Sequence, residues 1–234
     1  MIRGKDAVLF DLDGTLIDTA PDMVRVLDEM IAEHNAQPLP YDRVRSYVSN
    51  GSLGLVRLGF PNASKAEQRD LQTEYLERYA GNTCQDSRLF PGLEAFLDAM
   101  DAASLAWGVV TNKPTAMTET LLAGLQLTSR MACIVCGDTL PQRKPDPAPL
   151  LLGARQAGVA PQRIVYVGDA ERDIQAGRAA GMSTVAAAFG YIVDGDSAGD
   201  WGADQVATDV PELTELLGNA LDLHTRATGP YRQQ

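Results

Sequence analysis

The chain has 234 residues, 45% of them apolar, which suffices for one ordinary domain with a smaller one attached. Its formal net charge is -11. Such an acidic surface repels phosphate backbones and anionic lipids, so neither nucleic acid nor a membrane is an expected partner. No apolar run approaches the roughly 20 residues of a membrane span, and no signal-peptide pattern precedes the first apolar run. We therefore expect a cytoplasmic protein.

The first predicted strand is the apolar run Ala7–Phe10, and two carboxylates one residue apart follow it at Asp11 and Asp13. One interpretation is a turn whose aspartates bond their own backbone. The chemical interpretation makes Asp11 a nucleophile, because carboxylates form aspartyl-phosphates. Asp13 is then the general acid for the leaving oxygen and later the base for water.

Roughly ninety residues separate this strand from the next one, far more than a simple βαβ crossover needs. Their apolar residues recur at helical spacing, as at Val24, Leu27 and Ile31. The pattern predicts a helical cap at 18–84, inserted into a core made of 1–17 and 85–217, with a tail at 218–234.

One cap segment, at 49–54, combines glycines with small polar residues. We predict a loop that reaches the site and binds substrate through Ser49, Asn50 and Gly51. A plain interhelical loop fits the same residues.

Short apolar runs then alternate with helical patterns, at Ala106–Val110, 132–136, 164–167 and 184–189. This alternation predicts a doubly wound parallel α/β sheet. Ligands of such sheets bind at the carboxyl ends of the strands. Thr111 and Asn112 follow the second run, where a hydroxyl and exposed amides can hold phosphoryl oxygens, although threonine is also common at ordinary strand ends.

Two further groups complete the candidate site. Lys144 precedes Pro145 and Pro147, which stiffen the backbone, and it can offset charge on a transferred phosphoryl group; most lysines are simply solvated. Asp169 and Asp173 open a helix after the run at 164–167, where either could also cap it. Carboxylates gathered with Asp11 would repel one another unless a hard cation joined them, and Mg²⁺ fits best.

Three cysteines occur at wide spacing, which argues against a disulfide framework. Cys133 and Cys136 match C-x-x-C, but they lie in a strand-like run and not at a helix N-terminus, where redox pairs sit. We expect both to be buried structural residues.

Taken together, Asp11-x-Asp13-Gly14-Thr15, Thr111, Lys144-Pro145 and Gly168-Asp169-x-x-x-Asp173 resemble the four signature motifs of the haloacid dehalogenase superfamily, over the chain up to about residue 217. The resemblance implies that Asp11 is the nucleophile and Asp13 the acid and base. It implies that Thr111, Asn112 and Lys144 hold the phosphoryl group. Asp11, the backbone carbonyl of Asp13, Asp169 and Asp173 would serve Mg²⁺, Asp173 directly or through water.

The cap position resembles the branch of that superfamily containing phosphoglycolate phosphatases. Within it, the stretches at 107–114, 190–192 and 201–204 look like the N-acetylmuramate 6-phosphate phosphatases of cell-wall recycling. The resemblance implies a phosphatase for a small phosphorylated metabolite, with N-acetylmuramate 6-phosphate first and 2-phosphoglycolate as the alternative. A sugar phosphomutase, a dehalogenase and a phospho-accepting, non-catalytic module remain as rivals. The oligomeric state is not predicted.

Overall fold

The core of the computed structural model, which describes residues 2–223, is a parallel sheet. Its six strands lie in the order β5-β4-β1-β6-β7-β8, and every neighbouring pair is parallel. The strands are β1 (Ala7–Phe10), β4 (Ala106–Val110), β5 (Cys133–Val135), β6 (Ile164–Gly168), β7 (Ser183–Ala187) and β8 (Gln205–Ala207). The predicted fold class, a doubly wound α/β sheet, is confirmed.

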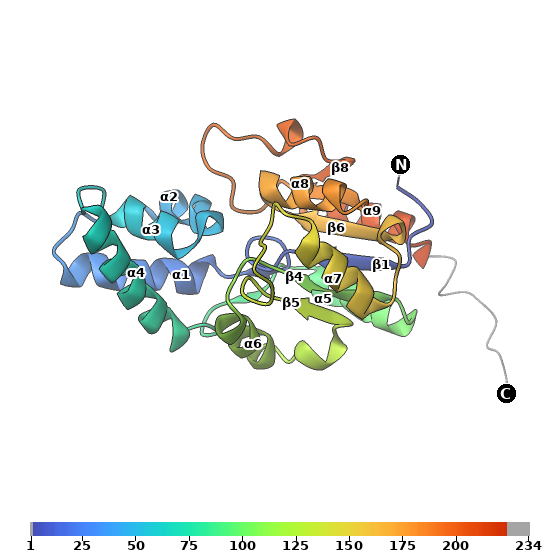
Figure 1. Cartoon of the computed structure of the whole chain (residues 1–234), viewed down its shortest axis with the longest axis horizontal. Helices are drawn as coiled ribbons and strands as arrows, with labels where there is room; N and C mark the ends of the chain where they lie inside the picture. The colour runs from blue at the N-terminus through green and yellow to red at the C-terminus, as the bar shows by residue number, and fades with distance from the viewer. Residues whose placement is uncertain (1, 224–234) are drawn as a thin grey trace.

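Helices cover both faces of the sheet (Figure 1). They are α5 (Leu93–Ala102), α6 (Thr115–Gly124), α7 (Ala148–Ala157), α8 (Glu171–Ala179) and α9 (Val210–Ala220). Successive side chains of a strand point to opposite faces. On β1, Ala7 and Leu9 pack in one apolar cluster with residues of α7 and α8, while Val8 and Phe10 join another with residues of α5 and α9. The central strand is therefore buried on both sides, which explains why it is apolar throughout.

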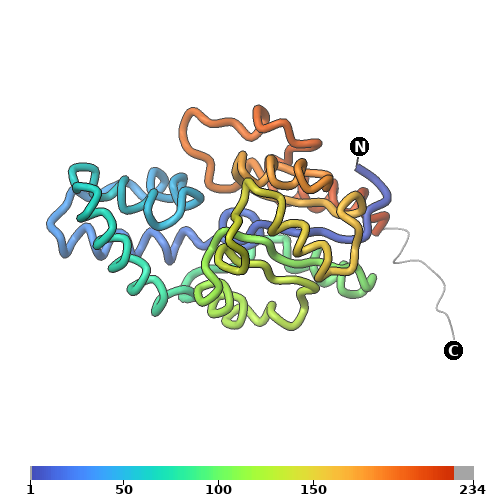
Figure 2. Tube along the Cα trace, in the orientation of Figure 1, coloured from blue at the N-terminus to red at the C-terminus, as the bar shows by residue number. Residues whose placement is uncertain are grey.

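A lobe of four helices projects to one side of the sheet (Figures 1 and 2). It contains α1 (Ala20–Glu33), α2 (Tyr41–Ser46), α3 (Gly51–Gly59) and α4 (Lys65–Ala80). The chain enters and leaves this lobe along a short antiparallel ribbon of β2 (Ile17–Asp18) and β3 (Arg88–Leu89). A site at the junction can therefore receive side chains from both parts.

The predicted loop at 49–54 is wrong in its local structure. Residues Val48–Asn50 form a 3-10 turn, and α3 starts at Gly51, whose φ is +70°. The glycines suggested a loop, but α3 forms because Leu55 and Val56 are fully buried. A methyl group at Gly59 would lie 3.1 Å from Leu27 Cδ1, so the glycine lets α3 lie close to α1.

The C-terminal boundary also differs from the prediction of a tail from residue 218. Helix α9 continues to Ala220, whose carbonyl accepts a hydrogen bond of 2.9 Å from the Lys5 amide. Leu221 is fully buried. These residues belong to the core, and residues 224–234 of the predicted tail lie outside the described residues.

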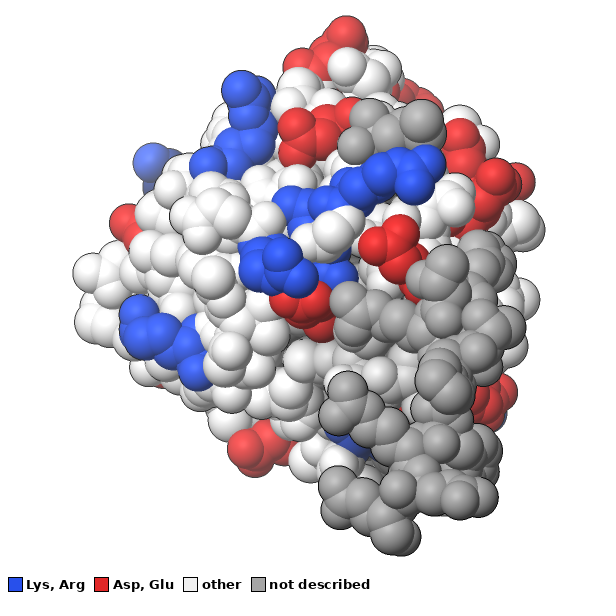
Figure 3. Space-filling model, turned by 90° about the vertical axis from the view of Figure 1, so that its right-hand side faces the viewer, with Lys and Arg blue, Asp and Glu red and all other residues white. Residues whose placement is uncertain are grey.

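The first strand, β1, begins at the end of the molecule away from the helical lobe (Figure 1), and acidic and basic side chains are interspersed on that end (Figure 3). Among the helices in residues 2–223, none combines the length and the apolar character that crossing a bilayer requires.

Candidate active site

The order of the strands brings three predicted site segments together. From β1 the chain continues to β4 and β5 on one side, then returns to β6 on the other side of β1. This reversal opens a crevice at the carboxyl ends of the strands. Asp11, Thr111 and Asp169 directly follow β1, β4 and β6. Residues far apart in sequence thus meet at one edge of the sheet.

A buried cluster of three carboxylates occupies this edge. One oxygen each from Asp11, Asp169 and Asp173 lies within 4.8 Å of the others. Burial and the charges of its two neighbours raise the pKa of Asp169 to about 7, and burial also raises the pKa of Asp173. Nearby cations therefore do not fully balance the cluster. A buried, oxygen-only donor set with uncompensated negative charge fits a hard divalent cation.

Lys144 joins the nucleophile candidate to this cluster. Its ammonium lies 2.8 Å from Asp11 Oδ1 and 2.7 Å from Asp173 Oδ1, and it donates to the hydroxyl of Tyr166 at 2.9 Å. The side-chain amide of Asn112 bonds to both the N–H and the carbonyl of Lys144, at 3.0 and 3.1 Å. The Asn112 side chain therefore positions Lys144.

Gly14 brings the backbone unusually close to the cluster. Its φ is +77°, and a Cβ at this position would lie 2.1 Å from Asp169 Oδ2. Only glycine combines this backbone conformation with this approach. The first signature segment is thus packed directly on the carboxylate that follows β6.

Asp13 lies apart from the three-carboxylate cluster and pairs with Lys113, a residue that the sequence interpretation left without a role. Lys113 Nζ lies 2.8 Å from Asp13 Oδ1 and 3.0 Å from the hydroxyl of Tyr79, which comes from α4 of the helical lobe. Thr19 Oγ1 also donates to Asp13 at 2.7 Å. Although burial opposes its charge, Asp13 and Tyr79 raise the pKa of Lys113.

The segment around Ser49 does reach the site. Its hydroxyl donates to Asp169 Oδ2 at 2.7 Å, and its carbonyl accepts a hydrogen bond of 2.9 Å from Arg172 Nη2. Arg172 was also missed. Burial opposes its charge, but Asp173, Asp11 and Asp169 raise its pKa. The position of Arg172 between Asp169 and Asp173 in the fourth motif could have indicated from sequence that it lies at the site.

A cavity of about 590 Å³ lies between the sheet edge and the helical lobe. Asp11, Asp13 and Thr111 line it from the sheet side. The lobe contributes the predicted residues Ser49, Asn50 and Gly51, with an apolar wall that includes Met23, Val48, Leu53, Tyr75, Leu76 and Tyr79. The cavity therefore adjoins both the candidate nucleophile and the candidate acid.

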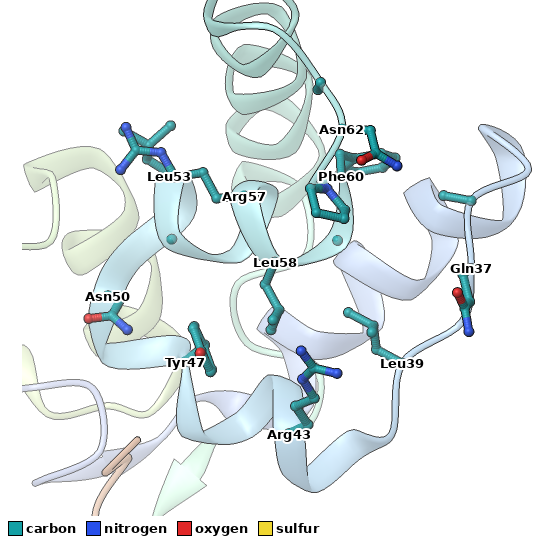
Figure 4. A pocket seen from close by; sticks show the side chains of 15 residues that line it. Gln37, Leu39, Arg43, Tyr47, Asn50, Leu53, Arg57, Leu58, Phe60 and Asn62 are labelled. Carbon is teal, nitrogen blue, oxygen red and sulfur yellow. The ribbon is translucent and has the colours of Figure 1, made fainter. Parts of the chain in front are cut away.

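A second hollow of about 940 Å³ lies within the helical lobe (Figure 4). Leu39, Arg43 and Tyr47 line it from one side, and Leu58 and Phe60 belong to α3 and the residue after it. It contains none of the carboxylates of the cluster. We assign no chemistry to it.

Comparison with known proteins identifies the family. The family model for haloacid dehalogenase-like hydrolases matches residues 8–187. The chain belongs to this family. An N-acetylmuramic acid 6-phosphate phosphatase of Pseudomonas aeruginosa is 41% identical over 216 residues, which is 92% of this chain and 96% of that protein. A phosphoglycolate phosphatase of Xanthomonas campestris is 42% identical over 214 residues, with 92% and 97% covered.

The fold agrees with this assignment. A crystal structure of a predicted phosphoglycolate phosphatase from Haemophilus somnus superposes with a TM-score of 0.80 at 26% identity, over 91% of this chain and 98% of that one. The predicted family and the enzyme class, a hydrolase that is a phosphatase of the haloacid dehalogenase type, are confirmed. The two relatives differ by one percentage point in identity, so identity does not choose between their substrates.

The prediction of buried structural cysteines agrees with the structure. Cys133 and Cys136 are buried and free. Burial raises the pKa of the Cys133 thiol to about 12. A thiol that stays protonated is a poor nucleophile and a poor redox partner.

Proposed function

We propose that this chain is a Mg²⁺-dependent phosphomonoesterase that passes the phosphoryl group through Asp11 to water. The observation that carries the proposal is the buried arrangement of Lys144 2.8 Å from Asp11 and 2.7 Å from Asp173, beside Asp169. A nucleophilic carboxylate cannot approach an anionic phosphate without such compensation.

In the first step, an Asp11 oxygen attacks phosphorus as the bond from phosphorus to the leaving oxygen breaks. Asp13 gives its proton to that oxygen. In the second step, water attacks the aspartyl-phosphate and gives a proton to Asp13, which restores both aspartates and releases phosphate. Lys144 and the Thr111 hydroxyl would hold the phosphoryl oxygens.

Asp11, Asp169 and Asp173, together with the carbonyl of Asp13, would hold the metal ion. When bound, Mg²⁺ supplies positive charge that offsets the charge of the phosphoryl group.

The preferred substrate in this proposal is N-acetylmuramate 6-phosphate, with 2-phosphoglycolate as the alternative. The names of the two similar phosphatases support these two equally. The cavity of about 590 Å³ favours the larger one, because a two-carbon leaving group would leave most of that space to water. Residues 18–84 would form the cap that selects the substrate, on a core of 1–17 and 85–217.

The test is steady-state release of phosphate from both substrates by the purified chain, with Mg²⁺ and with EDTA. We expect turnover only with the metal, a higher kcat/KM for the sugar phosphate, and loss of activity in Asp11→Asn. Turnover by Asp11→Asn at the wild-type rate would exclude the aspartyl-phosphate route. Transfer of phosphate to a sugar instead of water would favour a phosphomutase.

A further inference from the structure

Three cationic side chains line the catalytic cavity, from Lys113, Arg143 and Arg172. Two of them have protein partners. Lys113 pairs with Asp13 at 2.8 Å and with Tyr79 at 3.0 Å. Arg172 donates to the carbonyl of Ser49 at 2.9 Å and faces the charges of the acidic cluster. Their positive charge is already used to hold the site together.

Arg143 differs from both. It is exposed to the cavity, and within residues 2–223 its guanidinium makes no hydrogen bond and no ion pair. The acid on which its charge acts, Asp138, accepts hydrogen bonds from the Thr115 amide and hydroxyl instead. A guanidinium presents donors in a planar fork that matches a carboxylate. Here that fork is available to a ligand.

The base of the Arg143 side chain is fixed. The carbonyl of Arg143 accepts a hydrogen bond of 2.9 Å from the Asp146 amide. The next residue, Lys144, is held by Asn112 at 3.0 and 3.1 Å, and its ammonium contacts Asp11. The backbone of Arg143 is therefore fixed next to Lys144, which contacts the nucleophile candidate Asp11. A substrate whose phosphate is bound at Asp11 would lie close to the Arg143 side chain.

The opposite wall suits an uncharged body. On the lobe, Gln72 donates to the Ser52 hydroxyl at 3.0 Å, next to the apolar Leu53 and Leu76. Among the residues that line the cavity, the carboxylates are Asp11 and Asp13, which belong to the reacting end. A second negative group on the substrate could therefore bind the Arg143 guanidinium.

We propose that Arg143 determines specificity by binding a carboxylate carried by the leaving group, so that the preferred substrates are phosphomonoesters of hydroxy acids. This inference rests on the proposed function. N-Acetylmuramate 6-phosphate and 2-phosphoglycolate share this chemistry, since each carries a carboxylate beside its phosphate.

The decisive comparison is between N-acetylmuramate 6-phosphate and N-acetylglucosamine 6-phosphate, which has the same sugar ring without the lactyl ether that carries the carboxylate. In Arg143→Gln we expect the ratio of kcat/KM for the acid to that for the neutral sugar to fall about 10- to 100-fold, mainly through KM. A second experiment measures the same ratio with 2-phosphoglycolate as the acid and 2-hydroxyethyl phosphate as the substrate without a carboxylate. Comparison of the two ratios shows which of the two acids depends more on Arg143. Arg143→Lys keeps the charge without the fork and should recover part of the ratio.

Arg155→Gln is the matched control, because it removes the same charge from the exposed end of α7, away from the residues that line the cavity. We expect the wild-type ratio. An unchanged ratio in Arg143→Gln, or equal losses on acid and neutral substrates, would overturn the inference.

Binding separates this inference from the proposed function. In Asp11→Asn, the added change Arg143→Gln should weaken binding of N-acetylmuramate 6-phosphate, measured by calorimetry, by the same factor. Equal affinities would overturn the carboxylate site. Absence of turnover by the wild-type chain, with this loss of affinity present, would instead overturn only the hydrolysis mechanism.

Discussion

At the scale of single residues, the two predicted catalytic aspartates have different surroundings. Asp11 contacts Lys144 in the buried carboxylate cluster, and Asp13 contacts Lys113 and Thr19 outside it. An acid that must deliver a proton to a leaving oxygen needs a fixed orientation, since misplacement by about 1 Å can cost about 100-fold in rate. Lys113 fixes Asp13 and links it to Tyr79 of the lobe.

Lys113→Met is expected to lower kcat/KM for alkyl phosphomonoesters by about 10- to 100-fold, because Asp13 loses the partner that orients it. The loss should be much smaller for p-nitrophenyl phosphate, whose leaving group needs little protonation. Steady-state kinetics with both substrates measures the difference. Tyr79→Phe keeps the ion pair and serves as the control. Equal losses on the two substrates would contradict a role through Asp13.

The positions of several candidate site residues could be predicted from sequence because strand ends determine them. Asp11 and Asp169 lie at the ends of strands that are recognisable from their apolar runs. Lys113 and Arg172 stand within the same motifs, but their long side chains can bend in many directions. Their partners, Tyr79 and the Ser49 carbonyl, come from the lobe. Sequence spacing does not encode such contacts between parts of the chain.

At the scale of elements, a buried carboxylate joins the first helix of the lobe to the segment by which the chain returns to the sheet. Asp22, in the first turn of α1, accepts hydrogen bonds from the amides of Gln85, Asp86 and Ser87 and from the Ser87 hydroxyl at 2.7 Å. Although burial opposes its charge, hydrogen bonds from Ser87 and Arg25 hold the pKa of Asp22 below its ordinary value of 3.8.

Asp22→Asn should destabilise the protein by about 2 kcal/mol, because an amide nitrogen cannot accept these hydrogen bonds and leaves buried donors unpaired. A lowered pKa gives stability that is present above pH 3.8 and is lost as pH falls through the folded-state pKa. The variant should therefore lose less stability than wild type below pH 4. Urea unfolding between pH 3 and 7 measures this.

Glu29→Gln is the control for Asp22, since it changes the same charge on the exposed side of α1. A change within about 0.5 kcal/mol is expected there. If Asp22→Asn changed the free energy of unfolding as little as this control, the hydrogen bonds of Asp22 to residues 85–87 would not contribute to stability.

Elements were predictable where local pattern and burial agree. The strands Ala7–Phe10 and Ala106–Val110 have the predicted bounds. Helix α4 begins at Lys65 because Ser64 and Glu67 form reciprocal capping bonds at its N-terminus. Helix α3 was missed because its glycines suit close packing on α1, a reason that lies in another part of the chain.

At the scale of the whole molecule, the site lies where the sheet and the lobe meet. Asp169, on the sheet, accepts hydrogen bonds from Ser49 of the lobe and from the amide of Tyr191. The Tyr191 hydroxyl in turn accepts from the amides of Thr19 and Ala20, where α1 begins without a side-chain cap. Metal binding at Asp169 should therefore increase the free energy of unfolding of the whole protein.

This coupling predicts a pH-dependent effect of Mg²⁺. With EDTA, the raised pKa of Asp169 means that the folded chain keeps a proton that the unfolded chain releases above pH 3.8. Stability of the metal-free protein should therefore fall as pH rises towards 7. The ion needs the carboxylate form, so the gain in Tm from Mg²⁺ should grow between pH 5 and 8. At saturation of about 100 Kd it should reach roughly 5–10 °C.

Thermal unfolding in EDTA and in Mg²⁺, at several pH values, measures both trends. Asp169→Asn removes the titrating group and a ligand, so we expect a flatter pH profile with EDTA and a much smaller gain from the metal. A gain in Tm that is the same at pH 5 and pH 8, or that survives in Asp169→Asn, would mean that the ion binds elsewhere on this acidic protein. The proposed metal site would then be wrong, even with the sheet and the lobe placed as they are.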